Sequence, residues 1–570
     1  MSRSQYRPDH YYTYDEMVDY LHAVAREFPD LVTVESIGDS IEGRALWAVT
    51  VTDLKGRPPE DKPAVYIDAC IHAGEVSGTQ VCLHTIDHLT KNFGADEFLT
   101  ELLRSVTFYI LPRTNPDGAE YFLTTPSKQW GSARPYPRED CPRGLRERDM
   151  DGDGEILLMR YPDPNGEWKI SDLDPRLMIA RAPEDMNGDF YAILPEGELI
   201  GGAEPDDFRV LPREYQLNLN RNFPAGWEPD ALQPGGGEYP LSEPECRAVV
   251  EFIQAHPNIV VTHAYHTYGG LLMRPFGHLP DSEFHPMDLL TYQRLGEMGE
   301  RITGYPMVSV YESFTPDKKN PRRGVLHDWS YNHKGQVALG TEIWNLASRA
   351  GITRGDPENH YPFQDQSEED EARLLRFNDE QLQGEGFVDW TPFEHPQLGS
   401  VEIGGWKIKF TRKNPPPSFL EDECRRNTAF NVTYPASLPQ IQMKSLTVTP
   451  LDGKLVRIRV VVENAGYLPT NVTDMAVKMN EADPVTARID LPEGAELVDG
   501  EQVSDLGHLP GRMRRLRGFF FNEPESGIPK RTAATHWIVD LSGCNDREFS
   551  IRVGCPRAGW ITERRDLATF

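Results

Sequence analysis

Two periodicities of apolar residues divide the chain. Up to about residue 435, short apolar runs alternate with segments of helical spacing. From about residue 440, apolar and polar positions alternate one by one, as at Val456, Ile458, Val460 and Val462. A period near 3.6 is typical of helices, and a period of two is typical of strands with one buried face. The pattern predicts an α/β sheet with helices on its faces over 1–438 and an all-β sandwich domain over 439–570.

The first domain contains clear helix and strand signals. Thr13 and Glu16 have the capping-box pattern, and the helical spacing behind them ends at Pro29. Ser242 and Glu245 have a similar pattern ahead of a second helix. Strands are predicted at 46–51, 64–71, 106–111, 258–264 and 336–343, and helices at 75–92, 242–255 and 419–430.

Residues from about 131 to 212 interrupt this alternation. They are rich in Pro, Gly, Asp and Arg, which predicts a long insertion ordered by local polar contacts. Within it, Asp149, Asp151 and Asp153 have the spacing of the first half of a calcium-binding loop. Arg160 stands where the second half needs a bidentate glutamate, so the loop is no EF-hand. A structural calcium ion and a set of plain Asx turns both fit this sequence.

Composition narrows the kinds of partner. The formal net charge is −30, whereas a nucleic acid or an anionic membrane surface needs a positive footprint, so neither is expected. Arg512–Arg517 and Phe519–Phe521 are interpreted as a charged edge strand followed by a core strand. The seven scattered cysteines form no CxxC pair, which favours a cytoplasmic location. Secretion after removal of a leader is the alternative, and the oligomeric state stays unknown.

A candidate metal site begins at His72 and Glu75, where an apolar run ends and a predicted helix begins. Residues three apart at such a turn can direct a nitrogen and a carboxylate to one point, which suits zinc. A surface histidine beside a helix-capping glutamate would give the same pattern. His263 and His266 are the candidates for a third ligand. Because strand positions three apart point to opposite faces, at most one of them joins the site, and periodicity does not say which.

Glu342 ends an apolar run at 337–341 and so lies at the carboxyl edge of a predicted buried strand. Open α/β sheets form their active sites at that edge. A carboxylate beside a metal ion can take a proton from metal-activated water there. A capping or salt-bridged glutamate is the alternative.

Several separated motifs occur in a fixed order along the chain. They are Asn115–Gly118, Asn220–Phe223, His266–Tyr268 and Asp328–Asn332, the last followed ten residues later by Glu342. Together they resemble the carboxypeptidase A family of zinc metallopeptidases over about residues 8 to 435. The resemblance implies a mixed sheet flanked by helices, a zinc ion held by His72, Glu75 and His266, and removal of C-terminal residues from peptides with a free C-terminus.

The resemblance also implies roles for single residues. Glu342 would accept a proton from activated water and deliver it to the leaving amine. Asn220 and Arg221 would hold the terminal carboxylate of the substrate, Arg221 by a bidentate fork. Tyr268 would contact the substrate, and His263 would be a buried strand histidine that faces away from the metal.

Three positions depart from the family's pattern. The oxyanion-stabilising arginine normally follows a tryptophan, but Gly131 follows Trp130, so Arg134 is the nearest candidate, with a loop salt bridge as the alternative. The mobile substrate-binding tyrosine falls at Asn320. The aspartate that supports a ligand histidine is Asn218, whose neutral carbonyl still orients the ring but raises its basicity less.

The residue that lies near the base of the specificity pocket in relatives is His327. Lys318, Lys319, Arg322 and Arg323 precede it. Together these residues could favour an acidic side chain at the cleaved position. A solvated basic loop is the alternative.

A zinc exopeptidase is the main hypothesis for function. A related amidohydrolase acting on an amino-acid conjugate would also use Asn220 and Arg221, since such substrates carry a carboxylate. An inactive peptide-binding protein is the third hypothesis, but such a protein has no need for the complete set of His72, Glu75, His266 and Glu342.

Overall fold

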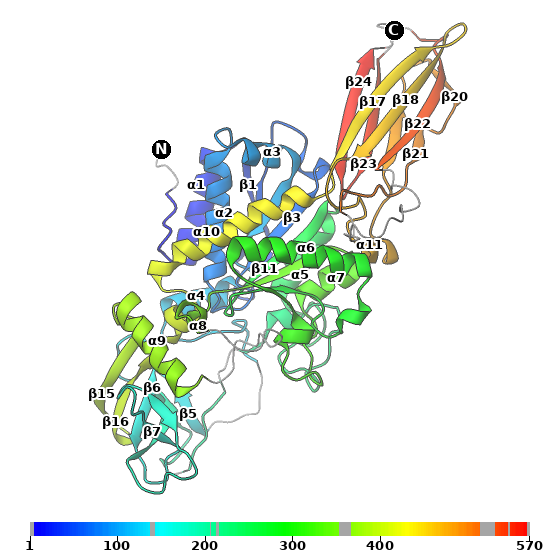
Figure 1. The fold of residues 1–570 in the computed structure, drawn as a ribbon. Coiled ribbons are helices and arrows are strands. Elements are labelled where there is room, and N and C mark those ends of the chain that lie inside the picture. Colours follow the sequence, from blue (N-terminus) through cyan, green and yellow to red (C-terminus); the bar gives the residue numbers. More distant parts are fainter. Residues whose placement is uncertain are drawn as a thin grey trace, which may run out of the picture.

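The structure is a computed structural model that describes residues 5–136, 143–205, 207–212, 216–352, 366–513, 531–544 and 548–566. A central domain of helices around a sheet lies between a small β-rich module and a C-terminal pair of sheets (Figure 1). None of the helices in these ranges has the length and apolar character needed to cross a bilayer.

An eight-stranded mixed sheet forms the middle of the central domain, as the sequence predicts. Its order is β1-β2-β4-β3-β11-β14-β12-β13. The inner strands from β4 to β14 pair in parallel, whereas β1, β2 and β4 pair antiparallel. The strands are β1 Val32–Asp39, β2 Ala45–Val51, β3 Ala64–Ala69, β4 Thr107–Leu111, β11 Ile259–Thr267, β12 Leu271–Arg274, β13 Met307–Ser309 and β14 Val337–Ile343.

Helices cover both faces of this sheet. Val65 and Ile67 of β3 belong to one core, together with residues of α1, α2, α3, α6 and α10. Ala64 and Tyr66 belong to the other core, under α5 and α7. Alternate residues of a strand point to opposite faces, so a strand buried on both sides is apolar throughout. The helices are α1 Tyr14–Glu27, α2 Ser77–Asn92, α3 Glu97–Ser105, α4 Pro116–Thr124, α5 Pro244–Ala255, α6 Pro286–Thr303, α7 Leu326–Lys334, α8 Leu346–Arg349, α9 Glu368–Gln381 and α10 Pro417–Thr433.

The two predicted helix caps have different outcomes. The capping box of α1 is confirmed, since Thr13 and Glu16 each accept the other's backbone N–H. The predicted Ser242 cap of α5 is wrong. Ser242 donates instead to the Glu243 carboxylate at 2.8 Å, and Glu245 accepts the distant Ile41 N–H at 2.9 Å. Proline follows at the first helical position, where no N–H needs a cap.

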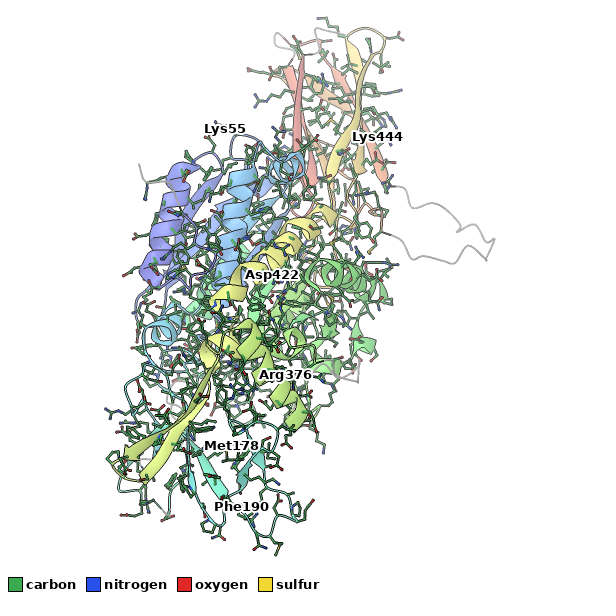
Figure 2. All side chains as sticks on the ribbon, turned by 60° about the vertical axis from the view of Figure 1, so that its left-hand side comes forward. Lys55, Met178, Phe190, Arg376, Asp422 and Lys444 are labelled. Atoms are coloured by element: carbon green, nitrogen blue, oxygen red, sulfur yellow. The ribbon has the colours of Figure 1, made fainter. Side chains whose placement is uncertain are left out.

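The insertion contains more regular structure than its composition predicts. Four of its strands pair with a hairpin from much later in the chain, in the order β15-β16-β6-β9-β7-β8, and β5 and β10 form a separate two-stranded sheet. Arg160 of β6 lies opposite Glu402 of β16, 242 residues away. Met178 and Phe190 mark this module in Figure 2, at the opposite end of the molecule from Lys444. The strands are β5 Gly144–Glu147, β6 Leu158–Pro162, β7 Trp168–Ile170, β8 Met178–Ala180, β9 Phe190–Pro195, β10 Gly197–Ile200, β15 Phe387–His395 and β16 Gly399–Trp406.

The C-terminal domain has two four-stranded antiparallel sheets, β17-β18-β22-β20 and β21-β19-β23-β24. Ile458 and Trp537 of one sheet share a buried core with Ile489 and Ile551 of the other, which confirms the predicted all-β domain. The predicted strands around Arg514–Arg517 and Phe519–Phe521 lie outside the described residues. The elements are β17 Ile441–Pro450, β18 Leu455–Asn464, α11 Asp474–Lys478, β19 Thr486–Asp490, β20 Glu496–Asp499, β21 Val503–Asp505, β22 Thr532–Asp540, β23 Glu548–Cys555 and β24 Gly559–Asp566.

Buried polar contacts attach this domain to the central one. Arg557 donates to the carbonyl oxygen of Gly335 in the central domain and, within its own domain, to that of Glu481, both at 3.0 Å. Asp288 of α6 accepts the backbone N–H groups of Asp474 and Met475 at the start of α11. Buried polar groups need hydrogen-bond partners, and here Arg557 and Asp288 find partners in the other domain. These bonds give the two domains a defined relative position.

Candidate functional site

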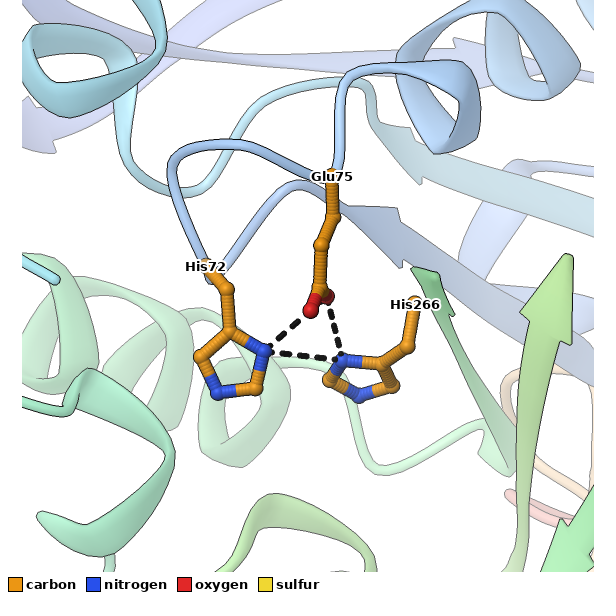
Figure 3. A group of neighbouring side chains, drawn as sticks. All are labelled: His72, Glu75 and His266. Atoms are coloured by element: carbon orange, nitrogen blue, oxygen red, sulfur yellow. Dashed lines mark hydrogen bonds and ion pairs between the residues drawn. The ribbon is translucent and has the colours of Figure 1, made fainter. Parts of the chain in front are cut away.

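Three buried side chains converge where β3 and β11 end. His72 and Glu75 lie in the turn between β3 and α2, and His266 lies near the carboxyl end of β11, which pairs with β3. The Nδ1 atoms of His72 and His266 each lie 2.9 Å from Glu75 Oε2 and 3.3 Å from one another (Figure 3). Two imidazole nitrogens and one carboxylate oxygen around a single point make a donor set suited to a metal ion.

The two histidines of β11 lie on opposite faces of the sheet, as strand positions three apart must. His266 lies in register with Glu342 of β14 and faces the cluster. His263 faces the opposite side, where its Nε2 lies 2.8 Å from Thr341 Oγ1 and its ring packs beside Phe430 and Tyr434. His263 is therefore a buried core histidine that faces away from the cluster.

Two neighbours hold the ring of His72 in place. Asn218 Oδ1 lies 3.1 Å from His72 Nε2, the nitrogen that faces away from Glu75. The indole of Trp130 stacks on the imidazole with ring centroids 4.5 Å apart and an interplanar angle of 14°. The sequence pointed to the contact with Asn218, whereas the stacking by Trp130 depends on how the chain folds back.

Burial and mutual charge shape the protonation of the cluster. Burial alone would raise the pKa of Glu75, but His72 and His266 hold it well below its ordinary value. Burial lowers the pKa of His72. It would lower the pKa of His266 as well, but the hydrogen bond with Glu75 raises that pKa above its usual value. Burial, and next the charge of Glu75, raise the pKa of Glu342 to about 8. Positive charge at the centre of this group would relieve the repulsion between the two carboxylates.

One cavity contains most of the residues that the sequence singles out. Glu342 is buried in its wall, and within the described part of the chain its Oε2 atom has no hydrogen-bond partner. The segment preceding α10 also contributes Lys413, to which no sequence motif pointed. The lining comprises His72, Glu75, Trp130, Asn220, Arg221, His266, Thr267, Tyr268, Met273, Val310, Phe314, Arg322, Val325, His327, Glu342 and Lys413.

Arg221 is held in this cavity without a carboxylate partner. Its Nη1 donates to the carbonyl oxygen of Asn220 at 2.6 Å, and no ion pair joins it to an acidic residue in the described ranges. Burial, followed by the nearby charge of Arg322, lowers the pKa of Arg221 to about 9. Two guanidinium groups that share one cavity create a strongly positive wall.

His327 contributes a neutral ring to the same wall, because burial lowers its pKa to about 4. Asp328 behind it accepts the Gly277 N–H at 2.9 Å and lies 2.6 Å from His278 Nδ1. Of the four basic residues that precede His327, only Arg322 lines this cavity, whereas Lys319 and Arg323 line a neighbouring one.

The candidate for the oxyanion-stabilising arginine and the residue at the position of the mobile tyrosine both lie elsewhere. Arg134 does not line the cavity, and its Nε donates to Glu243 at 2.7 Å, as in the alternative of a loop salt bridge. Asn320, at the position of the mobile tyrosine, is exposed and donates to Asp317 at 2.6 Å. Neither side chain reaches the metal-ligand cluster.

The acidic loop of the insertion resembles a set of Asx turns. Asp149 accepts the N–H groups of Gly152 and Gly154, and Asp151 accepts that of Asp153. The three carboxylates lie near one another, but backbone hydrogen bonds account for their spacing. Nothing further supports calcium at this loop.

Comparison with known proteins gives two family matches. A model described as zinc carboxypeptidase matches residues 17–176 and 196–348, together more than half of the chain. A model described as a domain of unknown function matches residues 440–565. The central mixed sheet with its helices agrees with the fold that the resemblance implied, and the C-terminal antiparallel sheets agree with the fold that the two-residue period predicted.

Individual relatives match parts of the chain. Rat carboxypeptidase A2 is 25% identical over 347 residues, which are 59% of this chain and 63% of that protein. Mouse carboxypeptidase D is 33% identical over 111 residues, which are 20% of this chain but 8% of that protein. The chain therefore spans less than two thirds of the length of these relatives.

Among solved structures, thrombin activatable fibrinolysis inhibitor is similar, with 18% identity and a TM-score of 0.44 over 76% of this chain and 75% of that chain. The family model, which spans the turn with His72 and Glu75 and the strands with His266 and Glu342, decides the assignment. The chain belongs to the zinc carboxypeptidase family.

Proposed function

We propose that this protein is a zinc-dependent carboxypeptidase that hydrolyses the C-terminal peptide bond of its substrates. One observation carries the proposal. The three-donor cluster, the buried carboxylate of Glu342 and the guanidinium of Arg221 all line a single cavity. A metal site, a base and an anion-binding group are the parts that removal of a C-terminal residue requires.

The donor set fits zinc. Two histidine nitrogens and one carboxylate form a common catalytic zinc site, which leaves a coordination position open for water or substrate. His72, Glu75 and His266 would hold the ion, and Asn218 and Trp130 would keep the ring of His72 oriented. A bound zinc ion supplies a Lewis acid that acidifies water and polarises a carbonyl group.

Glu342 is the proposed base. Its Oε2 has no hydrogen-bond partner in the described part of the chain and lies buried beside the cluster, so it is available to accept a proton from the attacking water. Return of that proton to the leaving nitrogen completes the hydrolysis. Burial keeps bulk water away from this carboxylate and strengthens its electrostatic interactions.

Arg221 is the proposed anchor for the terminal carboxylate. A half-buried guanidinium with no acidic partner in the described residues favours an anion supplied by the substrate. The backbone of Asn220 orients it, and the Asn220 side chain is itself held by the N–H of Leu326 at 3.0 Å. Tyr268 lines the same cavity as a substrate contact.

Arg322 and His327 support a preference for an acidic C-terminal side chain. Arg322 brings a second guanidinium into the cavity, and the neutral His327 adds no negative charge. A C-terminal glutamate presents two carboxylates, which two arginines bind better than one. No acidic side chain other than the ligand Glu75 and the base Glu342 is among the described residues that line this cavity.

An amidohydrolase acting on amino-acid conjugates would use the same groups, since its substrate also carries a carboxylate. It differs in that the acyl part of its substrate, which contains the cleaved carbonyl group, need not be a peptide. An inactive binding protein has no use for Glu342. Burying a carboxylate costs free energy, and without a catalytic role nothing would offset that cost.

Zinc content tests the metal ligands. His266→Ala removes a direct donor to the metal. It should therefore reduce zinc affinity by more than about 100-fold, the largest loss expected when only a residue supporting a ligand is removed. His263→Ala is the matched control on the same strand and should retain stoichiometric zinc despite some loss of stability. Elemental analysis after dialysis measures both. Equal zinc in the two variants would show that His266 is not a ligand.

Glu342→Gln tests the base. It should keep the metal and the fold but reduce kcat/KM by about 100-fold to 10,000-fold, because an amide accepts no proton at neutral pH. Hydrolysis of a chromogenic peptide and zinc analysis, performed on one preparation, measure the two properties. A variant with wild-type kcat/KM would exclude Glu342 as the base.

C-terminal amidation tests the carboxylate anchor. The wild type should cleave a free-acid peptide at least about 30-fold faster than its amide, since a buried charge pair contributes about 2 kcal/mol or more. Arg221→Ala should lose most of this discrimination. Arg323→Ala, whose side chain pairs with Glu228 outside the catalytic cavity, is the control. Equal rates on acid and amide would contradict the anchor.

A pair of peptides ending in Glu or Gln tests specificity. Wild-type kcat/KM should be roughly tenfold or more higher for Glu, and Arg322→Met should abolish that ratio while leaving cleavage of the Gln peptide largely intact. These two side chains differ little except in charge. A ratio near one for the wild type would support a solvated basic loop instead.

A further inference from the structure

We propose that the ammonium group of Lys413 supplies the positive charge that stabilises the oxyanion of the scissile carbonyl, the part that the sequence alone assigns to Arg134. The inference rests on the proposed peptidase function and adds a catalytic residue to it. It follows from where the chain just before α10 returns to the metal-ligand turn.

Lys413 lies against the turn that bears two of the three ligands. It ends the segment Ile408–Lys413, and its Nζ would lie 3.0 Å from a Cβ atom placed on Gly74. Gly74 precedes Glu75 directly, and Lys413 lines the same cavity as His72, Glu75 and Glu342. The ammonium group therefore lies beside the place where a metal-polarised carbonyl would bind.

The next residue holds this segment to the ligand turn. Asn414 is fully buried, and its Nδ2 donates to the carbonyl oxygen of Gly74 at 2.8 Å. Its Oδ1 accepts the backbone N–H of Ser77 at 3.1 Å. The indole of Trp344, two residues after Glu342, donates to the carbonyl oxygen of Thr411 at 2.7 Å. Lys413 is thus positioned by contacts on both sides of the site, as a preorganised charge requires.

The other basic groups have different positions. Arg134 is paired with Glu243, and its side chain is 39% exposed outside the cavity. Arg221 lies against Asn220, and the guanidinium of Arg322 donates to the carbonyl oxygen of Phe314 at 3.4 Å and lies over the ring of Phe314. Of the basic residues that line the cavity in the described ranges, Lys413 is the one that contacts the ligand turn.

The chemistry needs a cation at this position. When water oxygen bonds to the carbonyl carbon, the π electron pair moves onto the carbonyl oxygen and one water proton moves to Glu342. That electron pair then re-forms the carbon–oxygen double bond as the carbon–nitrogen bond breaks. The electron pair of the broken bond leaves with nitrogen, which takes the proton from Glu342. The oxygen is negatively charged only between these steps. An ammonium group directed at it stabilises the transition state more than the substrate, which raises kcat.

Lys413→Met, Lys413→Arg, Arg134→Met and Lys407→Met test the assignment. Lys407 lies just before the same segment, outside the cavity lining, and controls for loss of one charge there. Lys413→Met should lower kcat by about 100-fold to 1,000-fold with little change in KM or zinc content. Lys413→Arg should recover part of this loss, and Arg134→Met and Lys407→Met should keep kcat within about threefold of the wild type.

Inhibitor binding separates a catalytic role from a structural one. A phosphinic peptide carries an anionic tetrahedral centre, whereas a product peptide does not. Lys413→Met should lose affinity for the phosphinic peptide by about the same factor as kcat and keep its affinity for the product. Unchanged kcat in Lys413→Met, a large loss in Arg134→Met, or equal losses of both affinities would overturn the assignment. A wild type that cleaves no peptide would overturn the proposed function itself.

Discussion

Parallel pairing of β3, β11 and β14 is the constraint on which the candidate site depends. Because parallel strands end at the same edge of a sheet, the turn after β3, the end of β11 and the end of β14 come together. The register sets the finer detail, since His266 lies directly opposite Glu342. A shift of β11 by one residue would turn His266 toward the helices on the other face.

The edge of this sheet concentrates polar groups that an apolar interior disfavours. Glu75 and Glu342 are both buried within one small region, and each makes ionisation of the other harder. At Glu75, hydrogen bonds with two imidazoles offset the cost of burying a charged carboxylate. At Glu342, no comparable contact among the described residues offsets it. A site with a deficit of positive charge is therefore suited to a divalent cation, which would satisfy both carboxylates.

Segments remote in sequence complete the surroundings. Asn218 and Trp130 hold the ring of His72 from opposite ends of the insertion. Asn414 ties the segment before α10 to the ligand turn, and Trp344 ties it to the strand that bears Glu342. These contacts connect the site to the small β-rich module, because β16 leads directly into the segment with Lys413. The module thus contributes to the position of a cavity residue.

Some of these features were determined by the sequence alone. The helical and two-residue periods separate the α/β domain from the C-terminal sheets, because burial on one face imposes the period of the element. His72 and Glu75 share one short turn, so their proximity is a local matter. The motifs from Asn115 to Glu342 supplied the resemblance to the family through their order and spacing along the chain.

Only the tertiary structure decided the rest. Periodicity left the choice between His263 and His266 open and the resemblance implied His266, but the physical reason is tertiary, since it is which face of β11 meets Glu75. The pairing of β6 with β16 and the arrival of Lys413 beside Gly74 join segments hundreds of residues apart. Local propensity has no information about such contacts, because their energy comes from packing and burial that exist only once the chain has folded back on itself.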